Sequence, residues 1–332
     1  MINKHLMIII ILVSFGSCAG AGPSVECVDY RGWSGSYRMS AGRYSLVVVP
    51  AIGGRIMEYS LDGRNVIWEN AVEFGKVYEI TNDWRNYGGY KTWVSPQDYW
   101  HWPPDPILDR GKANVEVFDR DGRKWLRIIG QPSLKSGVMF IKELTLDENG
   151  EVTLIQKMRA VGKPPTKWGI HDVTQVKTPC FVVFPIRSDT RVPGGIRYLF
   201  GDPKKTAQFT VRDGLCITSY HGQVYQIGAE SDGPWMIWFQ DDMAYVKLFP
   251  PMKRDAEYGD RGSSAVVFTS DGKLGYLEME ILGPLIDLSD GEETELIERW
   301  RLFRLGECVK SPYSIKRIIS EMERKGLIPS RG

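Results

Sequence analysis

Residues 138–158 read VMFIKELTLDENGEVTLIQKM, and this stretch decides the fold class. The runs Val138–Leu146 and Val152–Met158 have the apolar and alternating character of β-strands. Asn149-Gly150 lies between them, and this dipeptide supplies the positive φ that a tight turn needs. The stretch therefore predicts an antiparallel β-hairpin.

The same pattern recurs along the chain, as in Asn114–Phe118 and Trp125–Ile129 around Asp121-Gly122. Further strands are expected at Tyr44–Val49, Arg55–Leu61, Phe181–Ile186, Val224–Ala229, Trp235–Phe239, Ala244–Phe249, Ser264–Thr269, Tyr276–Ile281 and Glu298–Leu305. More than ten strands without a visible repeat favour a large antiparallel β-sandwich, an all-β fold, over a propeller.

One helix is expected near the C-terminus. Ser314 is a suitable N-cap, Gly326 suits the C′ position, and one apolar stripe lies between them, formed by Ile315, Ile318, Ile319 and Met322. No Pro/Ser-rich linker or charge block divides the chain, so we expect a single domain over residues 29–328.

Composition excludes several classes of protein. The chain has 332 residues with 42 Lys+Arg against 41 Asp+Glu, and this balance gives no basic field for nucleic acid. The 11 Trp, 15 Tyr and 35 Gly are also untypical of a disordered chain.

The N-terminus resembles an export signal. Lys4 precedes the apolar run Leu6–Phe15, which is too short to span a bilayer, and Gly16-Ser17-Cys18 resembles a bacterial lipobox. We expect a lipoprotein-type signal peptide at 1–17, a lipid anchor on Cys18, a tether at 18–28 and a place in the bacterial cell envelope. The alternative is plain secretion to the periplasm or beyond, with cleavage near Ala19–Ala21. No second long apolar run is present, so membrane attachment is expected only through Cys18.

Four other cysteines are widely spaced, namely Cys27, Cys180, Cys216 and Cys308. An exported protein can form a disulfide such as Cys27 to Cys308, but the spacing assigns no pairing. The alternative is that all four are small buried apolar residues.

The densest candidate site is the aromatic stretch from Asn86 to Asp105, expected to be a loop stiffened by Pro103-Pro104. Aromatic faces beside neutral hydrogen-bonding groups suit sugars, which stack their C–H faces and hydrogen-bond through every hydroxyl. Trp93 by itself is expected in the core, whereas Trp100 and Trp102 are equally balanced between core and ligand platform. The candidate ligand contacts here are Asn86, Lys91, Trp93, Gln97, Trp100, His101 and Trp102.

Two further segments carry acid–base candidates. If residues 168–175 are extended, Ile170 and Asp172 share one face, while His171 and Gln175 share the other. His171 suits a general acid, and Gln175 suits orientation of a hydroxyl, although a lone histidine is more often structural.

In the strand Tyr276–Ile281, Glu278 and Glu280 share one face. One of them suits a general base and the other its electrostatic modulator. The alternative is an ordinary solvated strand face.

These segments resemble a known superfamily. Gly53-Gly54-Arg55-Ile56 and Leu61-Asp62-Gly63-Arg64 are similar to the first hairpin of galactose mutarotase-like proteins, the aldose 1-epimerases and their relatives. The blocks at residues 86–97, 168–175 and 278–300 resemble, more narrowly, the uncharacterised DUF4380 family. The resemblance spans Tyr44 to Leu305 and implies a β-supersandwich whose concave face binds a sugar.

The resemblance implies roles for single residues. His171 would protonate the ring oxygen, and Glu278 or Glu280 would accept the proton of the anomeric hydroxyl, with the choice left open. Arg55 and Lys91 would contact hydroxyls or a sugar carboxylate, and Asp172 and Gln175 would contact the ligand. The segment around His171 departs from the epimerase signature, and His101 is a possible substitute for a second histidine of that family.

The sequence therefore favours an exported, carbohydrate-binding, aldose 1-epimerase-like protein, expected to be monomeric and to bind a mono- or oligosaccharide. The alternative is a non-catalytic glycan-binding surface lipoprotein. A lyase or hydrolase is less favoured, because two glutamates side by side on one strand do not flank a scissile bond. No motif predicts a cofactor or a metal site.

Overall fold

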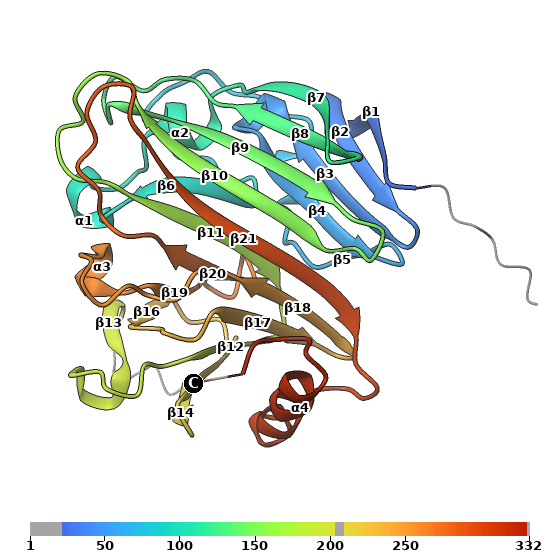
Figure 1. Cartoon of the computed structure of the whole chain (residues 1–332), viewed down its shortest axis with the longest axis vertical. Coiled ribbons are helices and arrows are strands. Elements are labelled where there is room, and N and C mark those ends of the chain that lie inside the picture. The colour runs from blue at the N-terminus through green and yellow to red at the C-terminus, as the bar shows by residue number, and fades with distance from the viewer. Residues whose placement is uncertain (1–21, 203–208, 331–332) are drawn as a thin grey trace, which may run out of the picture.

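The computed structural model describes residues 22–202 and 209–330, and the segment carrying the expected signal peptide and Cys18 anchor lies outside them. Two large antiparallel sheets pack face to face as a β-sandwich (Figure 1). The all-β prediction is therefore confirmed. No helix among the described residues is long and apolar enough to cross a membrane.

The first sheet has 11 strands and carries the site described below. Its spatial order is β1 (Ser24–Tyr30), β2 (Trp33–Ala41), β3 (Tyr44–Val49), β4 (Arg55–Leu61), β6 (Tyr90–Ser95), β11 (Gly169–Lys177), β20 (Tyr276–Leu282), β19 (Ala265–Thr269), β16 (Tyr225–Ala229) and β13 (Arg197–Phe200), with β5 (Arg64–Asn65) paired to β4.

The second sheet has 10 strands. Its order is β14 (Phe209–Arg212), β15 (Leu215–Ser219), β12 (Phe181–Pro185), β17 (Trp235–Gln240), β18 (Met243–Leu248), β21 (Glu293–Arg304), β10 (Val152–Ala160), β9 (Val138–Leu146), β8 (Arg123–Ile129) and β7 (Asn114–Arg120).

The helices are short, apart from the last one. They are α1 (Gln97–Trp100), α2 (Pro106–Arg110), α3 (Gly259–Gly262) and α4 (Pro312–Arg324), with single 3₁₀ turns η1 (Pro50–Ile52), η2 (Ala71–Glu73) and η3 (Pro193–Gly195).

The hairpin predicted from residues 138–158 is present as β9 and β10. The two strands pair in register from Val138 with Ala160 to Leu146 with Val152. Gly150 has φ +80°, and a Cβ there would lie 2.4 Å from ring carbons of Tyr44, so only glycine fits this turn. The Asp121-Gly122 hairpin likewise joins β7 to β8 with positive φ at both residues.

Several strands were not predicted. The expected loop from Asn86 to Asp105 contains β6, a central strand with all six residues buried. The first strand, β1, begins at Ser24 and pairs with β2, so the sheet begins inside the range 18–28 expected to be a tether. Polar residues interrupt the apolar pattern of β1, which occupies the edge of the sheet and has few buried positions.

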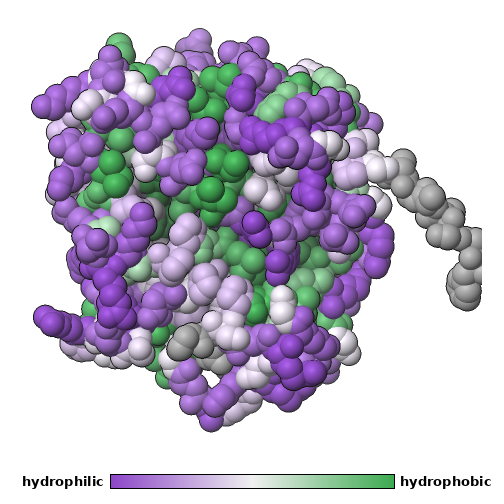
Figure 2. Space-filling view, viewed as in Figure 1, coloured by the Kyte–Doolittle hydropathy of each residue, from purple (hydrophilic) through white to green (hydrophobic). Residues whose placement is uncertain are grey.

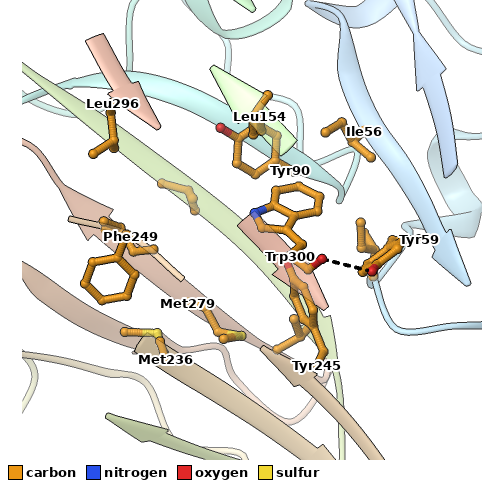
Figure 3. Packing of buried hydrophobic residues seen from close by; sticks show 14 of the residues in the cluster. Ile56, Tyr59, Tyr90, Leu154, Met236, Tyr245, Phe249, Met279, Leu296 and Trp300 are labelled. Carbon is orange, nitrogen blue, oxygen red and sulfur yellow. Dashed lines mark hydrogen bonds between the residues drawn. The ribbon is translucent and has the colours of Figure 1, made fainter. Parts of the chain in front are cut away.

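The main core lies between the two sheets. Trp300 of β21 occupies its centre, among rings from both sheets, and the Tyr59 hydroxyl donates to the Trp300 carbonyl at 3.3 Å (Figure 3). The core fixes the direction of every side chain on the central strands, because successive residues of a strand point to opposite faces.

Helix α4 covers part of the second sheet. The predicted stripe of Ile315, Ile318, Ile319 and Met322 is buried against residues of β12, β15, β17 and β18. The helix begins at Pro312, before the predicted cap at Ser314, because proline is well tolerated in a first helical turn. On the face shown in Figure 2, hydrophobic residues lie among hydrophilic ones.

The four cysteines among the described residues are all free. Cys180 and Cys216 are buried, as the alternative to a disulfide predicted, whereas Cys27 and Cys308 are exposed and not joined to each other.

Candidate functional site

A cleft of about 510 Å³ opens on the outer face of the first sheet. Its walls are aromatic, and two glutamates form part of its lining. The lining residues are Trp84, Trp93, Gln97, Asp98, Trp102, Leu199, Phe200, Val224, Gln226, Phe268, Tyr276, Glu278 and Glu280.

Strand alternation places both glutamates in the cleft. Leu277, Met279 and Ile281 of β20 point into the core, so Glu278 and Glu280 point outward between them. Gln175 of β11 lies directly opposite Glu278 across the sheet. The prediction that the two glutamates share one face is therefore confirmed, and the face is that of the cleft.

Glu278 is held from two sides through one of its oxygens. Lys91 Nζ donates to Glu278 Oε1 at 2.9 Å, and Gln175 Nε2 donates to the same oxygen at 2.8 Å. Lys91 is buried under the ring of Trp93, with its Nζ 4.8 Å from the ring centroid. Burial lowers the pKa of Lys91, and the charge of Glu278 opposes that fall.

Glu280 is paired with His171. His171 Nε2 and Glu280 Oε2 are 2.7 Å apart, and Gln226 Nε2 donates to Glu280 Oε1 at 3.1 Å. Burial by itself lowers the pKa of His171, but the hydrogen bond and charge of Glu280, with the charges of Asp260 and Glu278, raise it above the ordinary value overall. The distance of 2.7 Å places a hydrogen bond between His171 and Glu280 at the base of the cleft.

His171 itself does not line the cleft. Its exposed fraction is 0%, and it lies beneath the surface formed by Glu280 and Trp93, whose ring meets the imidazole edge-on at 6.0 Å. Its Nδ1 is buried without a hydrogen-bond partner. A ligand in the cleft can thus exchange a proton with His171 only through Glu280 or after a local movement.

Asp260 of α3 is a site residue that the sequence did not indicate. Its Oδ1 accepts a hydrogen bond from the backbone N–H of Gln97 at 3.0 Å, and its buried Oδ2 has no partner. Burial raises the pKa of Asp260, and the positive charge of His171 opposes that rise. Asp260 and Arg261 both have positive φ, 47° and 60°. No local pattern signals this strained turn, which brings the carboxyl near His171 from a distant part of the chain.

Asp172 is a correction to the predicted set of ligand contacts. It lies on the inner face of β11, is fully buried, and accepts a hydrogen bond from Lys247 Nζ at 2.6 Å. The predicted alternation of this strand is confirmed, and it is this alternation that turns Asp172 away from the cleft.

Arg55 is also absent from the cleft lining. It is 1% exposed and donates to Asp109 at 2.7 Å and to the Gly88 carbonyl at 2.9 Å. A Cβ on Gly53 would lie 2.3 Å from the Asp109 carbonyl oxygen, so a glycine is needed where the chain before β4 passes close to the backbone of α2. The Arg55 guanidinium therefore makes its hydrogen bonds within the protein rather than with a ligand in the cleft.

The aromatic segment divides between core and cleft. Trp93 and Trp102 line the cleft, whereas Trp100 is 8% exposed and donates through Nε1 to the Val94 carbonyl at 2.8 Å. His101 is exposed outside the lining.

The remaining predicted contacts follow the same division. Gln97 lines the cleft. Asn86 is buried, and its main-chain carbonyl accepts a hydrogen bond from the Asn70 side chain at 2.8 Å. Lys91 and Gln175 support Glu278 from below. Within residues 22–202 and 209–330, no group of three or more His, Cys, Asp or Glu side chains is placed to hold a metal ion.

Solved structures share the fold at low sequence identity. A candidate aldose 1-epimerase from Klebsiella pneumoniae is 12% identical, with a TM-score of 0.58 over 92% of this chain and 88% of its own. A galactose 1-epimerase from Lactobacillus acidophilus is 9% identical, with a TM-score of 0.54 over 85% and 99%. A galactose mutarotase-like protein from Clostridium acetobutylicum is 11% identical, with a TM-score of 0.53 over 86% and 99%. These likenesses establish a galactose mutarotase-like fold.

No curated protein matches the sequence. The family model described as "Domain of unknown function (DUF4380)" matches residues 36–303. This match includes strands of both sheets and all the residues that line the cleft. The chain therefore belongs to the DUF4380 family.

Proposed function

We propose that this chain is a carbohydrate-binding, aldose 1-epimerase-like protein that acts outside the cytoplasm. The observation that carries the proposal is the cleft, in which Glu278 and Glu280 lie between aromatic walls. A sugar ring stacks its C–H faces on aromatic rings and satisfies its hydroxyls with carboxylates and amides such as Gln226. The mutarotase-like fold of the chain agrees with this assignment.

The hydrogen bonds distinguish the two glutamates. Glu280 is engaged by His171, whereas both donors to Glu278 use Oε1, which leaves Oε2 as an acceptor for a ligand hydroxyl. We assign the general base to Glu278. The His171–Glu280 pair supplies the acid, because Glu280 reaches the cleft and His171 holds the proton behind it.

In the proposed reaction, Glu278, Glu280 and His171 supply and accept every proton that moves. Glu278 takes the proton of the anomeric hydroxyl while the bond between the anomeric carbon and the ring oxygen breaks. The His171 imidazolium passes its Nε2 proton to the Glu280 carboxylate, and the carboxylic acid so formed delivers that proton to the ring oxygen, which leaves His171 neutral. The open-chain aldehyde then rotates and recloses by the reverse steps.

Saturation-transfer NMR with free aldoses tests binding and chemistry together, since it reports ligand contact and exchange between α and β anomers. We expect accelerated exchange by the native chain. Glu278→Gln should reduce it by about 10²–10⁴-fold, the usual contribution of a positioned general base, while ligand contact remains. The matched control is Glu295→Gln, an exposed residue of β21 outside the cleft, which should leave exchange unchanged.

Non-catalytic glycan binding is the second candidate. It is favoured by the complete burial of His171 and by the ion pair that Lys91 makes with Glu278. Ligand contact without accelerated exchange in the native chain would support this candidate. Absence of contact with every sugar would contradict both.

Export by a lipid anchor is proposed from the N-terminal sequence alone. Mass spectrometry of the membrane fraction should find a diacylglyceryl group on Cys18 as the first residue. A soluble chain beginning near Ala21 would contradict the anchor and leave plain secretion.

A further inference from the structure

We infer that the cleft takes a glycan of two or more sugar units, and that Trp102 forms the stacking face of a second subsite outside the one floored by Glu278 and Glu280. The inference rests on the proposed function. It deepens that function by naming an oligosaccharide, rather than a free monosaccharide, as the preferred ligand.

The cleft has two levels. Its floor is deeply buried, with exposed fractions of 5% for Trp93, 7% for Glu278 and 1% for Glu280. Its rim is open, with Trp102 at 57% and Phe200 at 60%. A single ring bound at the floor would leave these rim aromatics in water, and exposed apolar side chains that gather along one groove mark a ligand-binding surface.

Trp102 is held in its exposed position by other rings. It meets Trp84 edge-on at 4.9 Å and Trp93 edge-on at 6.3 Å between ring centroids. Trp100, two residues earlier, is fixed in the core by its hydrogen bond to Val94. The rim is therefore preorganised, and little conformational entropy remains to be lost when a sugar stacks on it.

The polar groups beside Trp102 suit hydroxyls. Gln97 and Asp98 line the cleft at the start of α1, and Asp260 fixes the backbone of Gln97. Gln97 and Asp98 thus add an amide and a carboxylate to the cleft that Trp102 lines, and a sugar unit needs polar groups of this kind together with an aromatic face.

The size of the cleft agrees with a longer ligand. Its volume of about 510 Å³ lies within the range of roughly 300–1,000 Å³ of sites that bury drug-sized molecules, which are larger than one hexose. A second ring continuous with the first would fill the space between floor and rim.

The experiment compares affinity along matched series of increasing length. The probes are D-glucose, maltose and maltotriose; D-glucose, cellobiose and cellotriose; and D-galactose and β-1,4-galactobiose, titrated calorimetrically into the chain lacking its first 17 residues. We expect an affinity gain of about tenfold from one unit to two in at least one series. In Trp102→Ala this gain should disappear, with monosaccharide affinity unchanged within about twofold.

Two variants control for the fold and for the aromatic face. Trp102→Phe keeps a stacking surface and should retain most of the gain. Tyr99→Ala removes a neighbouring aromatic residue of α1 that is equally exposed, at 60%, but does not line the cleft, and it should retain the whole gain.

The outcomes separate this inference from the proposed function. Equal affinity for one unit and for longer chains, or a gain that survives Trp102→Ala, would overturn the second subsite while leaving sugar binding intact. Absence of binding in every series would overturn the proposed function and the inference together.

Discussion

Both faces of β11 carry buried pairs of ionisable side chains, but a ligand can approach only the pair on the outer face. On the outer face, His171 pairs with Glu280, and Gln175 supports Glu278. On the inner face, the very next residue, Asp172, pairs with Lys247 of the other sheet. Both groups are almost completely buried, but only the outer one borders a cleft.

The inner cluster contains one cation and two carboxylates. Lys247 Nζ donates to Asp172 and lies 3.2 Å from Glu298 Oε2. Burial and the charge of Glu298 raise the pKa of Asp172 well above its ordinary value, against the opposing charge of Lys247. The comparison teaches that a buried ion pair marks a functional site only where a ligand can reach it.

The largest effect is expected from removing the inner cation. Lys247→Met leaves two buried carboxylates without a charge partner and should lower the free energy of unfolding by about 3–5 kcal/mol. Urea denaturation measures the change. Lys124→Met is the control, because its ion pair with Asp119 is largely exposed, and it should cost less than about 1 kcal/mol. Equal losses in the two variants would contradict the structural role of the inner cluster.

An intermediate loss in the free energy of unfolding is expected from a change at the outer face of β11. Glu280→Gln removes the charge that raises the pKa of His171 and should cost about 1.5–3 kcal/mol at acidic pH. A histidine pKa raised above 6.5 in the folded state contributes stability that is fully present below about pH 6.5 and is lost as the pH rises through the folded pKa. The difference between native chain and variant should therefore shrink as the pH rises.

Denaturation series at several pH values, with an NMR titration of the His171 ring, measure this dependence. If the stability lost in Glu280→Gln grew as the pH rose, the assignment of a protonated His171 would be contradicted.

The smallest effect is expected from Asp260→Asn. Asparagine tolerates positive φ and can keep the hydrogen bond from the Gln97 backbone, so stability should change by less than about 1 kcal/mol. The pKa of His171 should fall, but by less than in Glu280→Gln, because the charge of Asp260 contributes less to it. NMR titration of the two variants side by side provides the measurement, and an unchanged pKa would remove Asp260 from the site.

The sequence predicted the two-sheet fold because its hairpins are local. Asp121, Gly122 and Gly150 adopt the positive φ that their residue types favour, so both turns can be recognised from the local sequence. Strand β6 was missed because Pro, Gly and aromatic residues surround it in the sequence, and only its burial between β4 and β11 makes it a central strand.

The candidate site could be predicted in part. The alternation of side chains along a strand was enough to predict that His171 and Gln175 share one face, and that Glu278 and Glu280 share one face. It could not show that Asp172 meets Lys247, because that contact joins two sheets. Nor could it find Asp260, whose place depends on a strained turn far along the chain.

The adjacency of His171 and Asp172 also fixes how β11 can pair. A shift of this strand by one residue would turn every side chain to the opposite face. Asp172 would then lose Lys247, and His171 would enter the apolar space between the sheets, so that two unpaired ionisable groups would be buried at once. This pair of neighbouring residues thus makes a shifted β11 energetically costly, and it helps the chain to adopt one alignment of a central strand.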